Sequence, residues 1–202
     1  MIATPARLKI DDSIFARAKR FTVAEYHALI ESGALTTENA LELLEGLLVE
    51  KMPIYPPHRF TTDEIRKLLT KLLEGKYFVS GQQPITIDNS EPEPDGYIAK
   101  GSSRDYLDKH PSAEDLFSVI EVSDSTLKID QTTKMQIYAR AGIAFYWILN
   151  LVDRQIEVYS NPSGEVENPT YKQRVIYTAE DSVPVEIGGE IFGEIKVADI
   201  LP

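Results

Sequence analysis

The sequence predicts a mixed α/β fold, with one β-sheet, helices on its faces and a strand-rich C-terminal part. Two apolar runs, Leu116–Ser123 and Phe145–Leu149, have the β-branched and aromatic composition of buried strands. The segment between them, Gln131–Ala141, has the apolar spacing of a helix and is followed by Gly142, a residue typical of helix ends. This strand–helix–strand order predicts a parallel pair of strands joined by a right-handed crossover.

The chain has 202 residues, 43% of them hydrophobic, and no cysteine. This length fits a single domain over residues 1–202, in which residues 1–20 are weakly patterned and are expected to form an N-terminal arm. The lack of cysteine excludes a disulfide framework and a thiolate metal site. No apolar run approaches the roughly 20 residues of a membrane span, and the first residues lack the layout of a signal peptide. We therefore expect a cytoplasmic protein with no membrane contact.

The net charge of −11 argues against a general nucleic-acid binder, whose affinity comes largely from neutralised phosphates. It does not exclude an enzyme that holds a short stretch of backbone through a metal and a local basic patch. Two groups of basic residues are candidates for such a patch, although each is also what a solvated face would contain. They are Arg17, Lys19 and Arg20, and Lys67 and Lys71.

Helix signals stand out in the N-terminal half. Thr22 and Glu25 have the spacing of a capping box, and Gly33 ends that helix. Thr61–Glu74 is the clearest helix, with a second capping box formed by Thr61 and Glu64. Pro53, Pro56 and Pro57 are expected to end regular structure before it.

The remaining elements are short. Leu41–Glu50 is ambiguous between a helix and a hairpin, and the pair Glu45-Gly46 favours a hairpin turn. Asp105–Glu114 is polar and is expected to be an exposed loop or a short helix. Turns are expected near Pro162-Ser163-Gly164 and Gly188-Gly189. Further strands are predicted at Tyr77–Val79, Ile85–Ile87, Gly96–Ala99, Gln155–Tyr159, Arg174–Tyr177, Val185–Ile187 and Ile195–Val197.

Two isolated acidic residues point to a metal site. Glu121 lies inside the apolar run Leu116–Ser123, and Asp95 stands at the start of Gly96–Ala99. An ionised carboxylate buried without a partner costs several kcal/mol, so such residues are usually paired, protonated or bound to a metal. Mg²⁺ and Mn²⁺ favour carboxylate, main-chain carbonyl and water ligands, so Asp95, Glu121 and the carbonyl of Val122 are a suitable set. A nearby lysine, Lys134, would orient water and stabilise charge on phosphorus.

This pattern resembles the PD-(D/E)xK superfamily of restriction-endonuclease-like proteins, and more closely its large prokaryotic branch of proteins described as restriction endonucleases. The resemblance extends from about Phe21 to about Tyr159. It implies a restriction-endonuclease-like mixed sheet flanked by helices. The residues that carry it are Leu41-Glu42-Leu43-Leu44-Glu45-Gly46, His58, Pro94-Asp95, Ile120-Glu121-Val122-Ser123, Asp130, Lys134-Met135-Gln136-Ile137-Tyr138-Ala139-Arg140-Ala141-Gly142 and Tyr146-Trp147.

One position departs from the pattern of the superfamily. The usual lysine stands two residues after the glutamate, where this chain has Ser123. In the branch it resembles, the lysine is taken to have moved to the next helix, which matches Lys134. The resemblance thus implies metal binding by Asp95 and Glu121 and catalysis by Lys134.

Four other residues are candidates for supporting roles. Glu42 would act as a secondary ligand or base, and His58 would contact phosphate or brace its loop. Ser123 shares a strand face with Glu121, and Asp130 is equally well explained as the N-cap of its helix.

The predicted function is that of a Mg²⁺- or Mn²⁺-dependent endonuclease that hydrolyses DNA phosphodiester bonds. By analogy with nucleases of this fold, it would work as a homodimer. The alternative is a non-catalytic module, derived from a nuclease, that binds nucleic acid or a protein partner. The acidic balance and Ser123 at the usual lysine position both favour that alternative.

Overall fold

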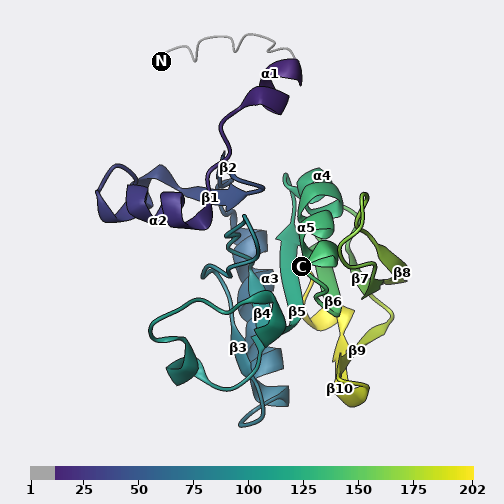
Figure 1. The fold of residues 1–202 in the computed structure, drawn as a ribbon. Coiled ribbons are helices and arrows are strands. Elements are labelled where there is room, and N and C mark those ends of the chain that lie inside the picture. The colour runs from purple at the N-terminus through teal and green to yellow at the C-terminus, as the bar shows by residue number, and fades with distance from the viewer. Residues whose placement is uncertain (1–11) are drawn as a thin grey trace.

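The structure, a computed structural model, describes residues 12–202 and is built around a six-stranded mixed sheet (Figure 1). In the strand order β3-β4-β5-β6-β7-β8, β5 and β6 run parallel and the other neighbouring pairs are antiparallel. The predicted mixed α/β class and the parallel pair are therefore confirmed. The strands are β3 Phe78–Ser80, β4 Gly96–Ala99, β5 Leu116–Ser123, β6 Phe145–Asn150, β7 Gln155–Pro162 and β8 Tyr171–Tyr177.

The segment between β5 and β6 is helical over a longer range than predicted. It begins with α4 (Leu127–Ile129), continues as a π-helical turn over Asp130–Lys134, and ends as α5 (Met135–Arg140). The prediction that Asp130 is the N-cap is wrong, because the helix already begins at Leu127. A π-helical turn inside a helix is often found at functional sites.

Helix α3 (Pro56–Leu72) also begins earlier than predicted. The expected start at Thr61 is wrong, because Pro56 and Pro57 occupy the first turn instead of ending regular structure. A proline is well suited to the first turn, where its missing N–H has no helical acceptor. Thr61 is fully buried, and its hydroxyl donates a hydrogen bond to the carbonyl of Ile200 at 3.1 Å.

The N-terminal elements include a helix and a hairpin, and Leu44 of the hairpin packs into the same core as Ile137 and Tyr138 of α5. Helix α2 (Val23–Glu31) has the predicted capping box of Thr22 and Glu25. The expected hairpin is confirmed as β1 (Leu41–Leu44) and β2 (Leu47–Glu50). Glu45 and Gly46 have φ of 51° and 75°, as this tight turn requires. Of the predicted arm, residues 1–11 lie outside the described range, and Asp12–Arg17 form helix α1.

One smaller prediction needs correction. Ile85–Ile87 is not a strand, since Thr86 and Ile87 make only isolated bridges, to Ser112 and Ser90. Both hairpins predicted in the C-terminal part are confirmed. A loop over 163–170 connects the antiparallel strands β7 and β8, and Gly188-Gly189 connects β9 (Ser182–Ile187) and β10 (Glu190–Lys196). The short 3₁₀ helices are Thr37–Asn39, Ser103–Tyr106, Ala113–Asp115 and Val197–Asp199.

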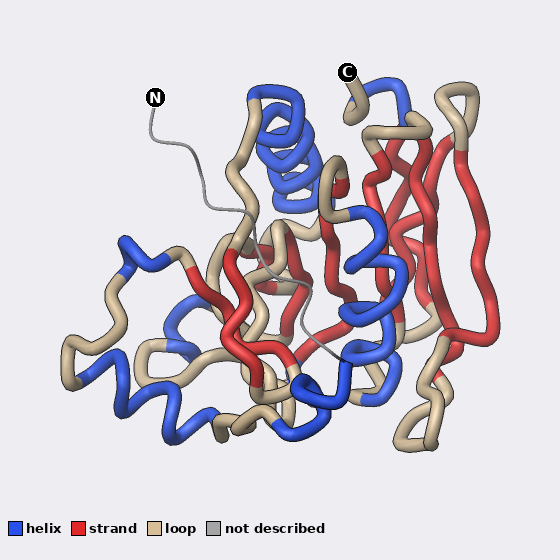
Figure 2. Tube along the Cα trace, turned by 90° about the horizontal axis from the view of Figure 1, so that it is seen from above, coloured by secondary structure: helices blue, strands red, loops and turns tan. Residues whose placement is uncertain are grey.

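The six-stranded sheet has a different cover on each face (Figure 2). Ile120 and Val122 of β5 pack with α3 and the β9–β10 hairpin. Val119, on the other face, belongs to the core that contains α5. Because side chains alternate along a strand, Glu121 points to the α5 face. No helix of residues 12–202 is long and apolar enough to cross a membrane.

Candidate active site

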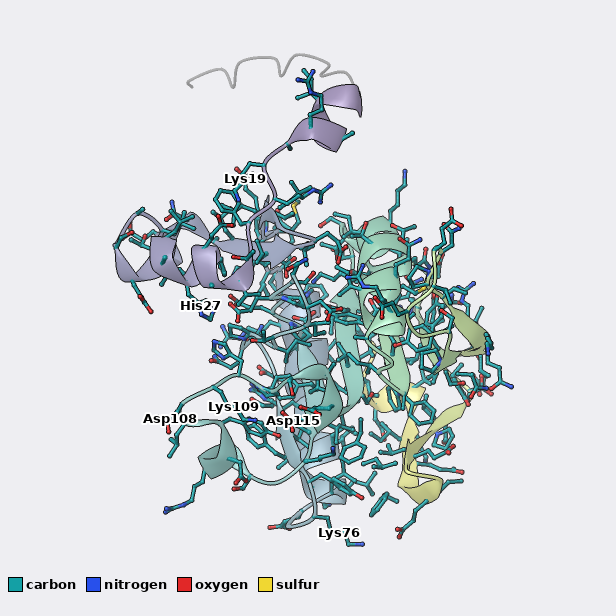
Figure 3. The ribbon with its side chains drawn as sticks, in the orientation of Figure 1. Lys19, His27, Lys76, Asp108, Lys109 and Asp115 are labelled. Carbon is teal, nitrogen blue, oxygen red and sulfur yellow. The ribbon has the colours of Figure 1, made fainter. Side chains whose placement is uncertain are left out.

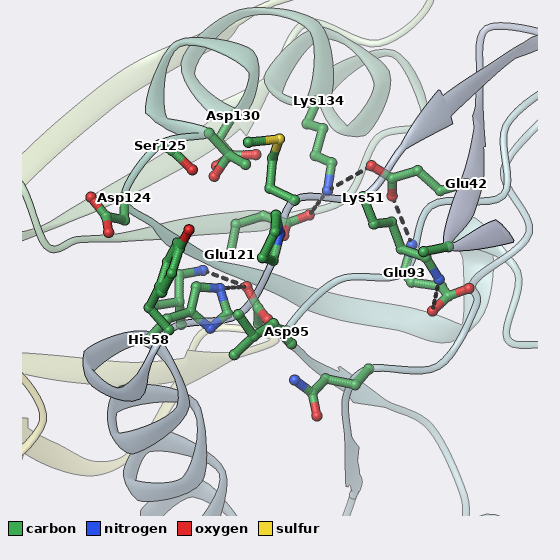
Figure 4. A pocket seen from close by; sticks show the side chains of 18 residues that line it. Glu42, Lys51, His58, Glu93, Asp95, Glu121, Asp124, Ser125, Asp130 and Lys134 are labelled. Atoms are coloured by element: carbon green, nitrogen blue, oxygen red, sulfur yellow. Dashed lines mark hydrogen bonds and ion pairs between the residues drawn. The ribbon is translucent and has the colours of Figure 1, made fainter. Parts of the chain in front are cut away.

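A cleft of about 530 Å³ opens where the β1–β2 hairpin, the start of α3, the start of β4 and the end of β5 meet (Figure 4). It brings together seven of the eight residues that the sequence singled out. Ser123 does not line the cleft, but it is the next residue after Val122. The seven that line it are Glu42, His58, Asp95, Glu121, Val122, Asp130 and Lys134.

Lys134 lies between two acidic residues. Its Nζ is 3.0 Å from Oε1 of Glu121 and 3.4 Å from Oε1 of Glu42. The hydroxyl of Tyr138, one helical turn after Lys134, donates to the same Oε1 of Glu121 at 2.7 Å. The predicted reach of Lys134 from the crossover helix back to the strand is therefore present.

Asp95 is held from two sides. Its Oδ2 accepts a hydrogen bond from the main-chain N–H of Val122 at 2.8 Å and lies 3.2 Å from Nε2 of His58. This contact to Val122 joins the start of β4 to the residue that follows Glu121. The arrangement thus fixes Asp95 beside the end of β5.

Gly81 allows the chain to pass close to Asp95. A Cβ at position 81 would lie 2.0 Å from the carbonyl oxygen of Asp95. Gly96, the residue after Asp95, has room for a Cβ, whose nearest neighbour would be Cβ of Ile120 at 3.4 Å. We expect Gly81→Ala to lower the free energy of unfolding by about 1–3 kcal/mol, because the backbone must move apart. Urea unfolding measures this cost. Gly96→Ala adds the same methyl group as a matched control, and equal costs for the two variants would contradict the expectation.

Asp130 supports the cleft from the helix side. Its Oδ2 accepts hydrogen bonds from the hydroxyls of Ser123 and Thr126, both at 2.7 Å. Ser123 is thus occupied with Asp130 rather than replacing the lysine that the superfamily usually has there. We interpret both residues as support for the end of β5.

The cleft has more negative than positive charge. Four carboxyl groups that are at most 9% exposed line the cleft together with Lys134, namely those of Glu42, Asp95, Glu121 and Asp130. Burial raises the pKa of Glu121 well above its usual value, against the effect of Lys134, and Asp130, Asp95 and Glu42 add to the rise. Burial also raises the pKa of Asp130. Burial would lower the pKa of Lys134, but Glu121, Glu42 and Asp130 outweigh it and raise that pKa, so the amine stays charged.

His58 is expected to make stability depend on pH. Burial lowers its pKa, but the hydrogen bond and charge of Asp95, with Asp130 and Asp124, raise it overall. Because the pKa of His58 is raised, its charged pair with Asp95 stabilises the fold fully below about pH 6.5. This stabilisation is lost as the pH rises through the pKa of His58 in the folded state. In a chelator, His58→Gln should therefore lose more unfolding free energy at about pH 6 than at about pH 9. Urea unfolding at both pH values tests this, and a pH-independent loss would contradict it. In an Asp95→Asn background the dependence should weaken.

The donor set fits a hard divalent cation. In the described part of the chain, neither Oε2 of Glu121 nor Oδ1 of Asp95 takes part in a hydrogen bond. Both carboxylates line the same cleft, and the surplus of acidic groups there would be offset by a divalent ion. Asp95, Glu121 and the main-chain carbonyl of Val122 are the groups that would hold it.

Several contributors were missed in the sequence. Tyr138 could have been found from its spacing, because it lies four residues after Lys134 and so on the same helix face. Lys51 and Glu93, which pair at 2.7 Å, also line the cleft, and only the fold brings them there. The suggested basic patches are partly neutralised, since Lys19 pairs with Glu25 and Lys67 with Glu64.

Comparisons with known proteins agree with this fold. The model of the Uma2 family, described as "Putative restriction endonuclease", matches residues 23–191. Among solved structures, the chain is similar to a "putative nuclease belonging to DUF820" from Anabaena variabilis, with a TM-score of 0.63 and 16% identity over 85% of this chain and 96% of that one. Among curated proteins none matches. Since the family model covers most of its length, the chain belongs to the Uma2 family of restriction-endonuclease-like proteins.

Proposed function

We propose that the protein is a Mg²⁺- or Mn²⁺-dependent endonuclease that hydrolyses phosphodiester bonds in DNA. The observation that carries this proposal is the cleft in which Glu42, Glu121 and Asp130 lie around one buried lysine, with a fourth buried carboxyl group, that of Asp95, beside His58. A purely structural cluster would balance its charges, because unpaired buried charge is costly. Membership of the Uma2 family adds support for nuclease chemistry.

The residues divide into those that hold the ion and those that act on water and phosphate. Asp95, Glu121 and the carbonyl of Val122 would hold the cation, which when bound supplies positive charge to the phosphate oxygens and lowers the pKa of bound water. Lys134, kept protonated by its acidic neighbours, is suited to orient the attacking water and to stabilise negative charge on phosphorus. A protonated lysine cannot act as the base.

The other candidates have supporting roles. Glu42 holds the ammonium of Lys134 from the side opposite Glu121. Its carboxylate also accepts a hydrogen bond from the main-chain N–H of Glu93 at 3.2 Å. His58 lies at the cleft wall, where its imidazolium could contact a phosphate oxygen while it holds Asp95. Hydrolysis forms a bond between the water oxygen and phosphorus and breaks the bond to the leaving sugar oxygen. The attacking water gives up one proton and the leaving oxygen takes up one, both exchanged with solvent water. Homodimerisation and cytoplasmic location stay predictions.

Metal dependence is the direct test. Titration of the chelator-stripped protein with Mn²⁺ should show binding, and supercoiled plasmid should be nicked with Mn²⁺ or Mg²⁺ and stay intact in excess chelator. Metal-independent nicking would contradict the proposal.

The second candidate is the non-catalytic module, favoured by Ser123, which bonds Asp130 instead of providing the usual lysine. That candidate predicts DNA or partner binding without any nicking in either metal. The two outcomes separate the functions in one series of measurements.

A further inference from the structure

A second group of metal-binding side chains lies outside the cleft, between α2 and the loops beneath it. It consists of His27 on α2, Glu91 and His110, so it uses two of the three histidines in the chain. One potential ligand atom from each residue lies within 4.8 Å of the other two. Figure 3 shows His27 on the side of α2 that faces the body of the protein.

The three residues come from parts of the chain that are fixed by other contacts. Tyr26, beside His27, is buried and anchors α2 through its hydroxyl to the carbonyl of Leu41 at 3.4 Å. The N–H of Glu91 donates to the carbonyl of Leu43 at 2.7 Å, so this residue is held to β1. The positions of the ligands are therefore set by the fold.

Thr86 links the remaining two residues. Its hydroxyl donates to Oε1 of Glu91 at 2.8 Å, and its main-chain N–H donates to the carbonyl of Pro111 at 2.9 Å. The first bond orients the carboxylate and leaves Oε2 directed to His27, whose Nε2 is 2.7 Å away. A hydrogen bond that orients a ligating carboxylate in this way is typical of metal sites. The second bond keeps the loop that carries His110 beside Glu91.

We propose that His27, Glu91 and His110 form a second metal site, selective for a divalent transition-metal ion such as Zn²⁺. Two imidazoles and one carboxylate suit Zn²⁺ and related ions, whereas Mg²⁺ prefers oxygen ligands. Tetrahedral zinc holds its ligand atoms about 3.3 Å apart. Small side-chain rotations reach that spacing, because His110 is exposed and the side chain of His27 is 42% exposed.

The surroundings leave space for a fourth ligand. The neighbouring cavity of about 560 Å³ is lined by all three residues, so water can complete the coordination. The ion would tie α2 to the Glu91 segment, which leads within four residues to Asp95. The two sites differ in chemistry, since the groups proposed to hold an ion in the cleft are all oxygens, whereas this site has two imidazole nitrogens and one carboxylate.

The test is a calorimetric titration of the chelator-stripped full chain with Zn²⁺ in excess Mg²⁺, which competes for the oxygen-rich cleft if the proposed function holds. We expect one Zn²⁺ per chain, and at least about tenfold weaker binding for His110→Ala and for His27→Ala. His110 is exposed, so its variant is expected to fold even if another variant does not. Thr86→Val should weaken binding about 10–100-fold, because it removes only the orienting hydroxyl.

Two controls keep the site distinct from the cleft. His58→Ala removes the third histidine and Glu121→Gln alters the cleft, and both should bind Zn²⁺ as the wild type does. X-ray absorption of the zinc complex should show two imidazole ligands. Absence of Zn²⁺ binding would mean that His27 and Glu91 form only an ion pair. That result, or wild-type affinity in both histidine variants, or loss of the Zn²⁺ ion in His58→Ala, overturns the proposal.

Discussion

Glu121→Gln is expected to abolish metal-dependent DNA cleavage while the protein stays folded. The amide keeps the size of the side chain but removes the charge that would hold the cation, so we expect cleavage to fall by at least about 10²–10³-fold. The amide oxygen of Gln can still accept the hydrogen bonds from Lys134 and Tyr138, and Glu42 and Asp130 remain near the ammonium, so we expect the variant to stay folded. Plasmid nicking with Mn²⁺, alongside circular dichroism, measures both effects.

Glu157→Gln is the matched control for this variant. Glu157 is fully buried on β7 and lies in register with Glu121 through Ile148, so the two acids occupy one row of the same sheet. Burial raises the pKa of Glu157, but hydrogen bonds from Asn150, Tyr159, Gln131 and Gln155 lower it overall. The negative charge of Glu157 is thus compensated by neighbouring hydrogen-bond donors, and Glu157→Gln should keep cleavage activity. Equal cleavage by Glu121→Gln and the wild type would refute the metal-ligand role.

These two acids also show how far the sequence can predict the site. Both occur in the same tripeptide, Ile-Glu-Val, at 120–122 and 156–158, and both are buried strand residues. Apolar patterning predicts the burial of each, but not its partners. Arg174 at 2.8 Å and four uncharged donors surround Glu157, whereas acids, Lys134 and the hydroxyl of Tyr138 surround Glu121. The partners come from other elements, so the apolar pattern that drew attention to Glu121 applies equally to Glu157, and the resemblance to a family is what distinguished the two.

The fold was predictable where local signals are strong. Glu45-Gly46 predicts its hairpin because the turn needs positive φ at both residues. The prediction that Pro56 and Pro57 end regular structure was wrong because proline is found both after helices and in their first turn. The residues that follow a proline decide between the two. Asp130 suits an N-cap, but the helix already begins at Leu127, and Asp130 inside it accepts hydrogen bonds from Ser123 and Thr126.

Lys134→Met is expected to have the largest effect on stability. It removes the ammonium that lies between Glu121 and Glu42 and leaves buried carboxylates without their partner, which should lower the free energy of unfolding by about 3–5 kcal/mol at neutral pH in a chelator. Cleavage should be lost as well, because water and phosphate lose their cationic contact. Urea unfolding measures the first effect, and plasmid nicking the second. Lys128→Met, on the exposed side of α4, should change stability by no more than about 0.5 kcal/mol.

The pH dependence of the Lys134→Met deficit separates a charge effect from lost packing. Without the ammonium, the already raised pKa of Glu121 rises further, so this carboxyl takes up a proton in the folded state as the pH falls. The deficit should then be largest at about pH 8 and shrink towards about pH 5, because protonation removes the uncompensated charge. Added Mn²⁺ should recover part of the stability at about pH 8, since an ion bound only by the folded state stabilises it. If the loss of unfolding free energy in Lys134→Met changes neither with pH nor with added Mn²⁺, Lys134 contributes through packing alone. The surplus of negative charge in the cleft would then give no support to a metal site.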